Sequence, residues 1–410
     1  MSFYDAIRVG ASGAAGTYTV DRSLRFNYTE YLTRTPSSTG NQKVWTWSAW
    51  IKRTEIGSKD YIYSANDGGS GYFALYFKDD NLYSYFDPGN NYGSVSDREF
   101  RDVGAWFHIV HQVDALNTTQ RIWINGTEMS LNSSRNPSNS NFPMNESGIT
   151  LYIGKASWKS EYNNMYLAEV HYSDGYKYQA SDFAETDSET GQWVPKSPSI
   201  TYGTNGFYLN FSDNSGTTAT TLGKDSSGNG NNFTPNNFSV AAGVGNDSII
   251  DTPTNNFATL NPLSLIGTGG TFSNGNLDFT ADGNYSTRAG NFSLKTGKWY
   301  WEIRLFVASY VYQFGIFDIE SPTNQRASTV AASVTSSTND ITHGSEIVQS
   351  AELEIGGQKI DKHTHEWNNV WNELTTPDSK APGLKAMQCE TNGRSGSDLS
   401  VGLIQIPLNF

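Results

Sequence analysis

Short segments rich in aromatic and β-branched residues recur along the first half of the chain, and Gly, Asn, Asp or Pro separates each from the next. They run from "SLRFN" through "WTWSAWIKR", "DYIYSA", "YFALYFK", "NLYSYF", "WFHIVHQVD", "QRIWING" and "LYIGKA" to "YLAEVHYSDG". A spacing of about 8 to 12 residues between turn signals is typical of two-layer β-sandwiches. The pattern therefore predicts one all-β domain of about 180 residues, and residues 20–205 are expected to fold cooperatively on their own.

The segment "WTWSAWIKR" shows the strand period most clearly. Trp45 and Trp47 fall on one face and Thr46 and Ser48 on the other, so one face should be buried. The segments "WFHIVHQVD" and "QRIWING" are expected to form a hairpin-like pair, with Asn125-Gly126 as the turn that follows.

Composition narrows the class of protein. With 410 residues, the chain has room for two or three domains, and 17% charged residues with 39 glycines suit turn-rich β-sandwiches. A net charge of -13 argues against a nucleic-acid partner, because phosphate binding needs clustered Lys and Arg. Cys389 is the only cysteine, which excludes an intrachain disulfide. No apolar run reaches the roughly 20 residues that cross a bilayer, and we expect no membrane partner and no ordinary export signal.

The composition changes after about Gly206. Dense Gly, Asn, Ser and Thr as far as Gly270 predict a strand or two and then a long connector anchored by phenylalanines. Strand patterns return in "NLDFT", "KWYWEIRLFV" and "YVYQFGIFDI". Further on, "AELEI" alternates like a strand, Gly356-Gly357 favours a turn, and "QKIDKHTHEWNNVWNEL" is expected to form one short helix that ends before Pro377.

The segments "SLRFNYTEYLTRTP", "VWTWSAWIKR", "WFHIVHQVD", "RIWINGTEM" and "GFYLNFSDNSGTTATTLGKDSSGNGNNFTPNNFSV" together resemble the LamG-like, concanavalin A-like jelly-roll family. The resemblance covers about Tyr18 to Leu263 and is specific to versions found in tail-associated and other structural proteins of marine viruses and phages. It implies a jelly-roll sandwich, a lectin-like role and location in a virion.

Two further resemblances follow along the chain. "SNGNLDF", "TGKWYWEIRL" and "YQFGIFDIE" look like the opening strands of a SPRY domain, although the rest of such a domain is missing. "AELEIGGQKIDKHTHEWNNVWNELTTPDSKAPGLKAM" and "LIQIPLNF" resemble part of the first jelly roll of the major capsid protein of large nucleocytoplasmic DNA viruses, over roughly Gly344 to Phe410.

These readings predict an all-β fold: a concanavalin A-like jelly-roll sandwich followed by a smaller, incomplete β region with one short helix near the C-terminus. The expected divisions are an arm at 1–17, the jelly roll at 18–210, a connector at 211–270, SPRY-like strands at 271–325 and a capsid-like segment at 326–410. The last strand, "LIQIPLNF", has no partner in the sequence after it and, left alone, would be an exposed edge. Residues 344–410 are therefore expected to be the least securely folded part, either packed loosely on the SPRY-like strands or completed by another chain.

Aromatic residues at loop-like positions are candidates for sugar stacking, because flat rings beside Asn and Asp side chains suit neutral sugars. The candidates are Tyr61, Tyr72, Tyr92, Trp158 and Tyr162. The alternative for each ring is ordinary packing in the sandwich.

Metal and catalytic candidates are fewer. Asp213, Asp225 and Asn229 resemble calcium-loop chemistry, with Asx turns that need no ion as the alternative. His363 and His365 could share a metal only on a strand. His108 and His111 should point to opposite faces of their strand, and no "ExDxE"-like pair of carboxylates suggests a glycoside hydrolase. We expect no catalytic residues and, calcium apart, no cofactor.

The leading hypothesis is a non-enzymatic virion structural protein whose jelly roll binds glycans or another virion protein, as a homo-oligomer. One alternative is a capsid-building subunit with a β insertion, and another is a polysaccharide depolymerase on the same fold.

Overall fold

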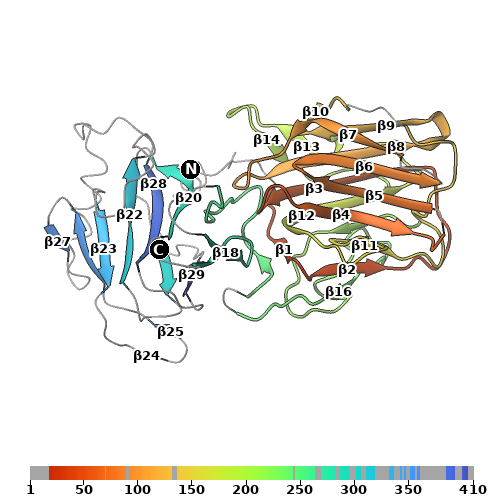
Figure 1. Ribbon diagram of the computed structural model, residues 1–410. Coiled ribbons are helices and arrows are strands. Elements are labelled where there is room, and N and C mark those ends of the chain that lie inside the picture. The colour runs from red at the N-terminus through yellow and green to blue at the C-terminus, as the bar shows by residue number, and fades with distance from the viewer. Residues whose placement is uncertain are drawn as a thin grey trace. The chain divides into compact units, whose positions relative to one another are not determined.

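The computed structural model describes residues 18–281 apart from 70, 89–91, 132–135, 243–244 and 264–268, and after them the strands from β20 onward. Beyond residue 291 only the backbone of those strands is described. The chain divides into two compact units, Met1–Phe257 and Ala258–Phe410. The described residues contain strands and two short 3-10 helices, η2 (Ala115–Asn117) and η3 (Ala180–Asp182), which confirms the all-β jelly-roll prediction (Figure 1).

The first sheet of the sandwich is antiparallel, in the order β10-β9-β8-β3-β12-β1-β17, with β15 also paired to β12. Its strands are β10 (Thr127–Glu128), β9 (Thr119–Ile124), β8 (Phe107–Asp114), β3 (Val44–Arg53), β12 (Asn164–Asp174), β1 (Ser23–Asn27), β17 (Ser248–Ile249) and β15 (Phe207–Leu209). The predicted hairpin-like pair is β8 and β9, which are neighbours in this sheet.

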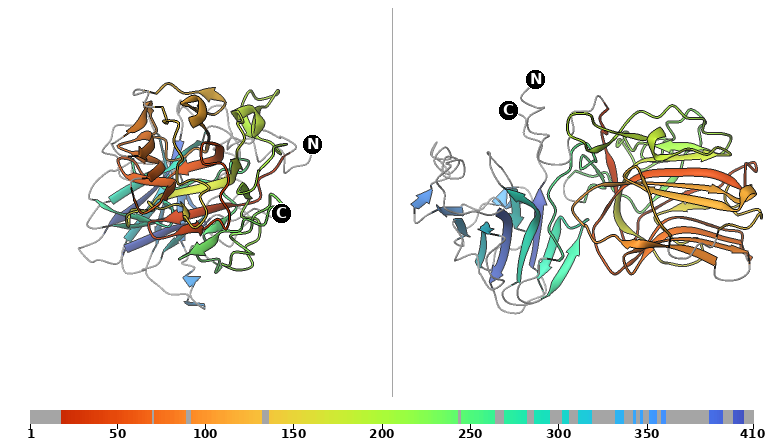
Figure 2. Two further views of the ribbon diagram at one scale, coloured as in Figure 1. Left: turned by 90° about the vertical axis from the view of Figure 1, so that its right-hand side faces the viewer. Right: turned by 90° about the horizontal axis from the view of Figure 1, so that it is seen from above.

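The second sheet has the order β16-β2-β11-β4-β5-β6-β7. Its strands are β16 (Thr234–Asn236), β2 (Tyr31–Arg34), β11 (Leu151–Ile153), β4 (Lys59–Asn66), β5 (Gly71–Lys78), β6 (Asn81–Pro88) and β7 (Tyr92–Glu99). The two sheets form the two layers visible from above in Figure 2. Between them, Trp47 stacks on Tyr63 at 5.0 Å and Trp45 meets Phe73 edge-on at 5.2 Å, as the alternation in "WTWSAWIKR" predicts for the inward face.

The opposite face of the central strands of the first sheet is buried as well, which differs from the one-sided burial expected for β3. Every residue of β3 and of β12 is buried. The cover comes from the segment that holds η3, β13 (Ala184–Thr186) and β14 (Trp193–Pro195), and from residues near Val20 and Ile249. Trp50 and Trp123, on the covered face, pack in these outer clusters.

Two cations lie under this cover, and residues far along the chain neutralise them. The Lys52 ammonium is fully buried, 2.8 Å from the Asp251 carboxylate, and it also donates to Asn256 and to the Phe257 carbonyl. Arg25 pairs with Asp247 at 3.1 Å. A buried cation without a counter-ion is very costly, so residues 247–257 are an integral part of the sandwich.

The stretch after residue 210 therefore belongs to the first unit as far as Phe257. It supplies β16 to one sheet and β17 to the other, and Phe211, Phe233 and Phe238 enter the core. A fragment of residues 20–205 lacks Asp247 and Asp251, so we revise the expectation that it folds on its own. The finer division into five segments stays a prediction.

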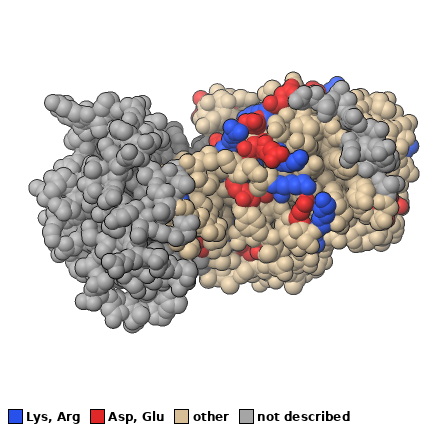
Figure 3. All heavy atoms as spheres, in the orientation of Figure 1, with Lys and Arg blue, Asp and Glu red and all other residues tan. Residues whose placement is uncertain are grey.

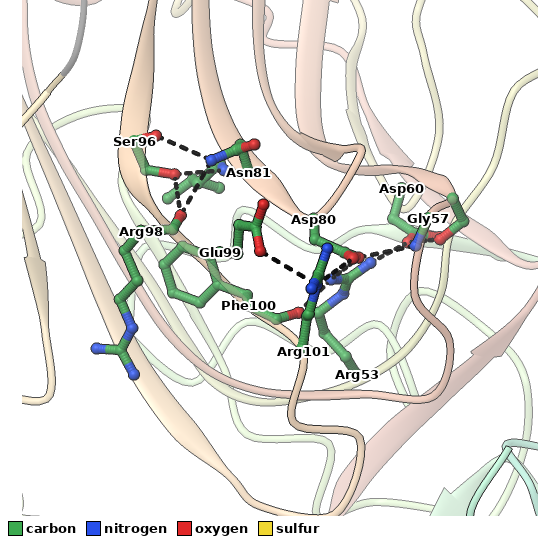
Figure 4. A network of polar contacts seen from close by, with 12 residues as sticks. Arg53, Gly57, Asp60, Asp80, Asn81, Ser96, Arg98, Glu99, Phe100 and Arg101 are labelled. Carbon is green, nitrogen blue, oxygen red and sulfur yellow. Dashed lines mark hydrogen bonds and ion pairs between the residues drawn. The ribbon is translucent and has the colours of Figure 1, made fainter. Parts of the chain in front are cut away.

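A second charged network joins the two sheets at the end of β3 (Figure 4). Arg53 contacts Asp60 of β4 at 3.4 Å and Asp80, in the turn after β5, at 3.0 Å. Asp80 also accepts hydrogen bonds from Gly57 and Arg101. Burial raises the pKa of Asp80, but these donors outweigh it and hold the pKa below its usual value. One buried guanidinium thus ties β3 to the facing sheet.

Strand β12 contains a bulge whose extra residue is a buried acid. The pairing of β12 with β3 shifts between Ala168 and His171, and Glu169 adopts a positive φ of 51°. Its carboxyl group accepts hydrogen bonds from Tyr18 at 2.6 Å and Tyr208 at 2.8 Å. Burial raises the pKa of Glu169 to about 7 and lowers that of nearby His171 to about 3, so no imidazolium offsets the carboxylate.

The second unit pairs strands that come from both ends of its sequence. One sheet has the order β18-β19-β29-β21, and another has the order β20-β28-β22-β23-β26-β27. Strands β24 and β25 form a separate two-stranded sheet. The bounds are β18 (Gly270–Ser273), β19 (Asp278–Ala281), β20 (Ser286–Leu294), β21 (Glu302–Leu305), β22 (Val311–Asp318), β23 (Ala332–Ser336), β24 (Thr342–His343), β25 (Glu346–Ile347), β26 (Ala351–Ile355), β27 (Gln358–Ile360), β28 (Lys385–Asn392) and β29 (Leu399–Ile404).

This pairing bears on two expectations. Of the final segment "LIQIPLNF", the structure describes Leu403 and Ile404, which pair with Ile303 and Glu302 of β21, one of the strands expected to be SPRY-like. Residues Gln358–Ile360, expected to begin the short helix, form β27 instead. The rest of that helix, with His363, His365 and Pro377, lies outside the described residues, as does the expected arm at 1–17.

We expect Asp251→Asn to lower the free energy of unfolding by about 3 kcal/mol or more, because it leaves the Lys52 ammonium buried without a counter-ion. Urea denaturation of the full chain measures the change. The matched control is Glu128→Gln, which removes an exposed ion pair with Arg121 and should cost less than about 1 kcal/mol. Equal midpoints for the two variants would contradict the role given to Asp251.

We expect Glu169→Gln to gain stability over the wild type as pH rises. The folded-state pKa of Glu169 lies above its unfolded value, so its contribution is full below about pH 4.5 and is lost as pH rises through about 7. The difference between variant and wild type should therefore grow by about 3 kcal/mol from pH 4.5 to 8. Denaturation at several pH values measures it, with a substitution of an exposed acid, Glu185→Gln, as the control. A flat difference for Glu169→Gln would disprove the raised pKa.

Candidate functional site

The outer face of the second sheet, which points away from the core, is not buried like that of the first. In β5, Phe73, Leu75 and Phe77 enter the core, whereas Tyr72 and Tyr76 are half-buried on the opposite face. Tyr61, Tyr76 and Tyr83 lie directly opposite one another on neighbouring strands. Their rings stack at 4.9 and 5.2 Å, which makes a line of tyrosines across β4, β5 and β6.

A loop after β11 places a tryptophan on this face. Ser64 of β4 donates a hydrogen bond to the Lys155 carbonyl at 2.8 Å, and Ala156 packs in a small cluster with Tyr61 and Ala74. Trp158 is half-buried and meets three tyrosines, Tyr61 at 5.7 Å, Tyr72 at 5.1 Å and Tyr85 at 6.4 Å. We call Tyr61, Tyr72, Tyr85 and Trp158 the Trp158 cluster.

Beside it lies a second group, here called the Lys155 cluster: Tyr31, Tyr152, Lys155 and Tyr162. The Lys155 ammonium lies 4.6 Å from the ring centre of Tyr31, 5.5 Å from Tyr152 and 5.3 Å from Tyr162. Such distances are within the range of cation–π attraction. The cluster joins β2 and β11 to the loop that carries Trp158, so aromatic rings extend across the sheet from β2 to β6.

The structure thus brings together three of the sequence candidates, Tyr61, Tyr72 and Trp158. Tyr61 is only 2% exposed, so its ring supports the cluster and offers little free surface. Tyr162 lies in the Lys155 cluster, and for Tyr92 only the backbone is described, paired with Phe86. The sequence reasoning missed Tyr76, Tyr83 and Tyr85, although the alternation in "YFALYFK" and "NLYSYF" places all three on one face.

Charges of both signs are interspersed on the surface of the first unit (Figure 3). Lys59 lies over the rings of Tyr61 and Tyr76 at 5.4 and 5.7 Å, and it pairs with Glu161 at 2.9 Å. Burial raises the pKa of Glu161, but the contacts with Lys59 and Tyr61 outweigh it, and the net shift is below the usual value. Glu161 is therefore an ionised partner of Lys59 rather than a proton donor.

The calcium candidates are engaged in hydrogen bonds with the protein itself. Asp225 accepts hydrogen bonds from the backbone of Tyr208, Ser227 and Asn231, while Asn229 donates to two backbone carbonyls. Asp213 accepts from Ser215 two residues on. Among the described residues there is no group of three His, Cys, Asp or Glu that could hold a metal ion. The calcium site stays a prediction.

The two histidines of β8 are on opposite faces, as the strand period predicts. His108 bonds to Ser48 and Trp193 under the covering layer, and His111 bonds to Tyr63 within the core. Burial lowers the pKa of His108 to about 3 and that of His111 to about 4, so both are neutral packing residues. No helix in the described part of the chain is long and apolar enough to cross a membrane.

Comparison with known proteins gives two family matches. Residues 26–181 match the concanavalin A-like lectin/glucanases superfamily, and residues 316–410 match the major capsid protein N-terminus. The chain is 44% identical over 54 residues to the major capsid protein of Pyramimonas orientalis virus, a stretch that is 13% of this chain and 13% of that protein. The SPRY resemblance stays a prediction.

Solved structures give weaker likenesses. A SAP-like pentraxin from Limulus polyphemus is 17% identical, with a TM-score of 0.31 over 38% of this chain and 77% of that one. Domain 4 of the arabinanase AbnA from Geobacillus stearothermophilus, solved with arabinotriose, is 13% identical, with a TM-score of 0.30 over 40% and 75%. Similarity at this level carries no functional conclusion.

The capsid-protein similarity supports a virion component, the localisation that the sequence predicts, and together with the lectin-like fold it supports a viral structural protein. Residues 26–181 are thus similar to the concanavalin A-like lectin/glucanases superfamily, and residues 316–410 to the N-terminus of major capsid proteins.

Proposed function

We propose that this protein is a non-enzymatic virion structural protein whose sandwich binds a glycan on the outer face of its second sheet. The observation that carries the proposal is the Trp158 cluster, in which a half-buried indole is held among three tyrosines on an open face. Sugar sites combine such flat apolar surfaces with a few well-placed polar groups.

The indole is held firmly in place. The loop is attached to β4 through the Ser64 hydrogen bond, and Lys155 forms a backbone bridge with Tyr162. Buried Tyr61 supports Trp158 from below, edge to face at 90°. A rigid aromatic surface loses little conformational freedom when a ligand binds, which favours affinity.

The arrangement suits an extended chain of sugars rather than a single ring. The aromatic residues run from β2 through β11, β4 and β5 to β6, four strand spacings of about 4.8 Å each. A polysaccharide lying across the strands could meet the Lys155 cluster, the Trp158 cluster and the exposed parts of Tyr76 and Tyr83 in succession.

The charges on this face favour binding of a glycan without its cleavage. A glycoside hydrolase needs two carboxyl groups about 5 to 9 Å apart, one of them with a raised pKa. Glu161, the acid beside the Trp158 cluster, is paired with Lys59 and has a lowered pKa. Assembly with other virion proteins, including copies of this chain, is the role we propose for the capsid-like segment.

We expect a glycan array probed with the full chain to give binders, and Trp158→Ala to weaken binding by about tenfold or more, because it removes the central aromatic surface. Affinity measured by calorimetry or interferometry checks the change. The matched control is Tyr176→Ala, which removes a ring that is 44% exposed near the covered first sheet and should leave affinity unchanged.

Three outcomes would count against the proposal. The array could give no binders, Trp158→Ala could bind like the wild type, or the wild-type chain could release reducing ends from a bound polysaccharide. The last result would favour the depolymerase alternative.

A further inference from the structure

We propose that the Lys155 cluster is a subsite for an anionic substituent, a sulfate or carboxylate, on the bound glycan. The inference rests on the proposed function and names a chemical class for its ligand. It starts from the difference between Lys155 and the other lysines beside the aromatic rings of this face.

Those other lysines have carboxylate partners. Lys59 pairs with Glu161 at 2.9 Å, and Lys78 lies 3.8 Å from Asp79. Among the described residues, no carboxylate lies within ion-pair distance of Lys155, whose ammonium faces only the three tyrosine rings. The acid nearest to Lys155 in the sequence, Glu161, already forms ion pairs with Lys59 and Lys159. Lys155 is therefore a cation available to a ligand.

The tyrosines around Lys155 add donors to this charge. The phenol groups of Tyr31, Tyr152 and Tyr162 have no hydrogen-bond partner within the part of the chain that the structure describes, whereas Tyr18 and Tyr208 bond to Glu169. A phenol O–H can donate to an anion, and hydrogen bonds to charged groups are about twice as strong as neutral ones. One ammonium and three phenols give a donor set for a sulfate or carboxylate.

The geometry is fixed from several sides, which distinguishes this group from a lone surface lysine. The Lys155 carbonyl accepts the Ser64 hydrogen bond, and its backbone is bridged to Tyr162. Tyr31 lies 6.2 Å from Tyr152 and 6.0 Å from Tyr162, on β2, β11 and the loop respectively. All four side chains are half-buried, so they are ordered by packing and remain accessible.

The subsite also continues from the sugar platform. Lys155 and Trp158 belong to the same short loop, and Tyr152 lies opposite Ser64 of β4, the strand that carries Tyr61. A glycan ring stacked on Trp158 therefore has the Lys155 cluster beside it in the direction that crosses the strands, from β4 toward β11 and β2. With a net charge of -13, the protein repels polyanions in general, so recognition must come from a local donor set such as this one.

The test uses the full chain with two probes of the same backbone and length, dextran sulfate and unmodified dextran. We expect the wild type to prefer dextran sulfate, and Lys155→Gln to weaken that binding about tenfold while leaving dextran binding unchanged. Lys155→Arg should restore most of the loss. Tyr152→Phe, which keeps the ring and removes one hydroxyl, should give a smaller loss. Lys43→Gln, which removes another half-buried lysine bonded to Asn139, is the matched control.

The outcomes separate this inference from the proposed function. If Trp158→Ala loses glycan binding but Lys155→Gln binds dextran sulfate like the wild type, the anion subsite is wrong and the glycan face stands. Failure of the wild type to prefer dextran sulfate over dextran also overturns the subsite. The glycan array, which is a separate measurement, still decides whether the face binds glycans. Equal losses for Lys155→Gln and Lys43→Gln would indicate nonspecific charge attraction and refute the subsite as well.

Discussion

The sandwich depends on the complete burial of the two central strands of its first sheet, β3 and β12. Strands β3 and β12 are covered on both faces, and their outer faces include Lys52 as well as Trp50 and Tyr166. Burial of an ammonium is tolerated only with a counter-ion, and the chain supplies Asp251 from 199 residues away. The covering layer and residues 247–257 are thus required by the charges that the central strands bury.

The two sheets differ in how their outer faces are covered: the covering layer packs on the first sheet, whereas the outer face of the second sheet is open. The second sheet keeps the alternation of core and surface residues typical of an antiparallel sheet with one open side. Its open face carries tyrosines in register, and the loop of Trp158 packs on it. The asymmetry of the sandwich explains why the candidate binding residues gather on this face and why the histidines of the first sheet are merely packed.

In the second unit, too, residues far apart in the sequence lie together, here as paired strands of the same sheet. Strand β28 lies between β20 and β22, and β29 lies between β19 and β21. The match to the capsid protein begins at residue 316, inside β22, so the strands expected to be SPRY-like and those that match the capsid protein share the same sheets. A strand with partners on both sides satisfies its backbone groups, and most of β28 is placed in this way.

The sequence alone determined the all-β class, the strands of the sandwich and the face on which Tyr72, Tyr76 and Tyr83 lie, because strand alternation is a local property. Only the tertiary structure decided the rest. A bulge between Tyr61 and Tyr63 sends the first ring outward and the second into the core, although alternation places them on one face. Likewise, which segment covers a sheet, which acid neutralises Lys52 and which rings surround Lys155 depend on contacts between residues far apart in the chain, and local periodicity carries no information about such contacts.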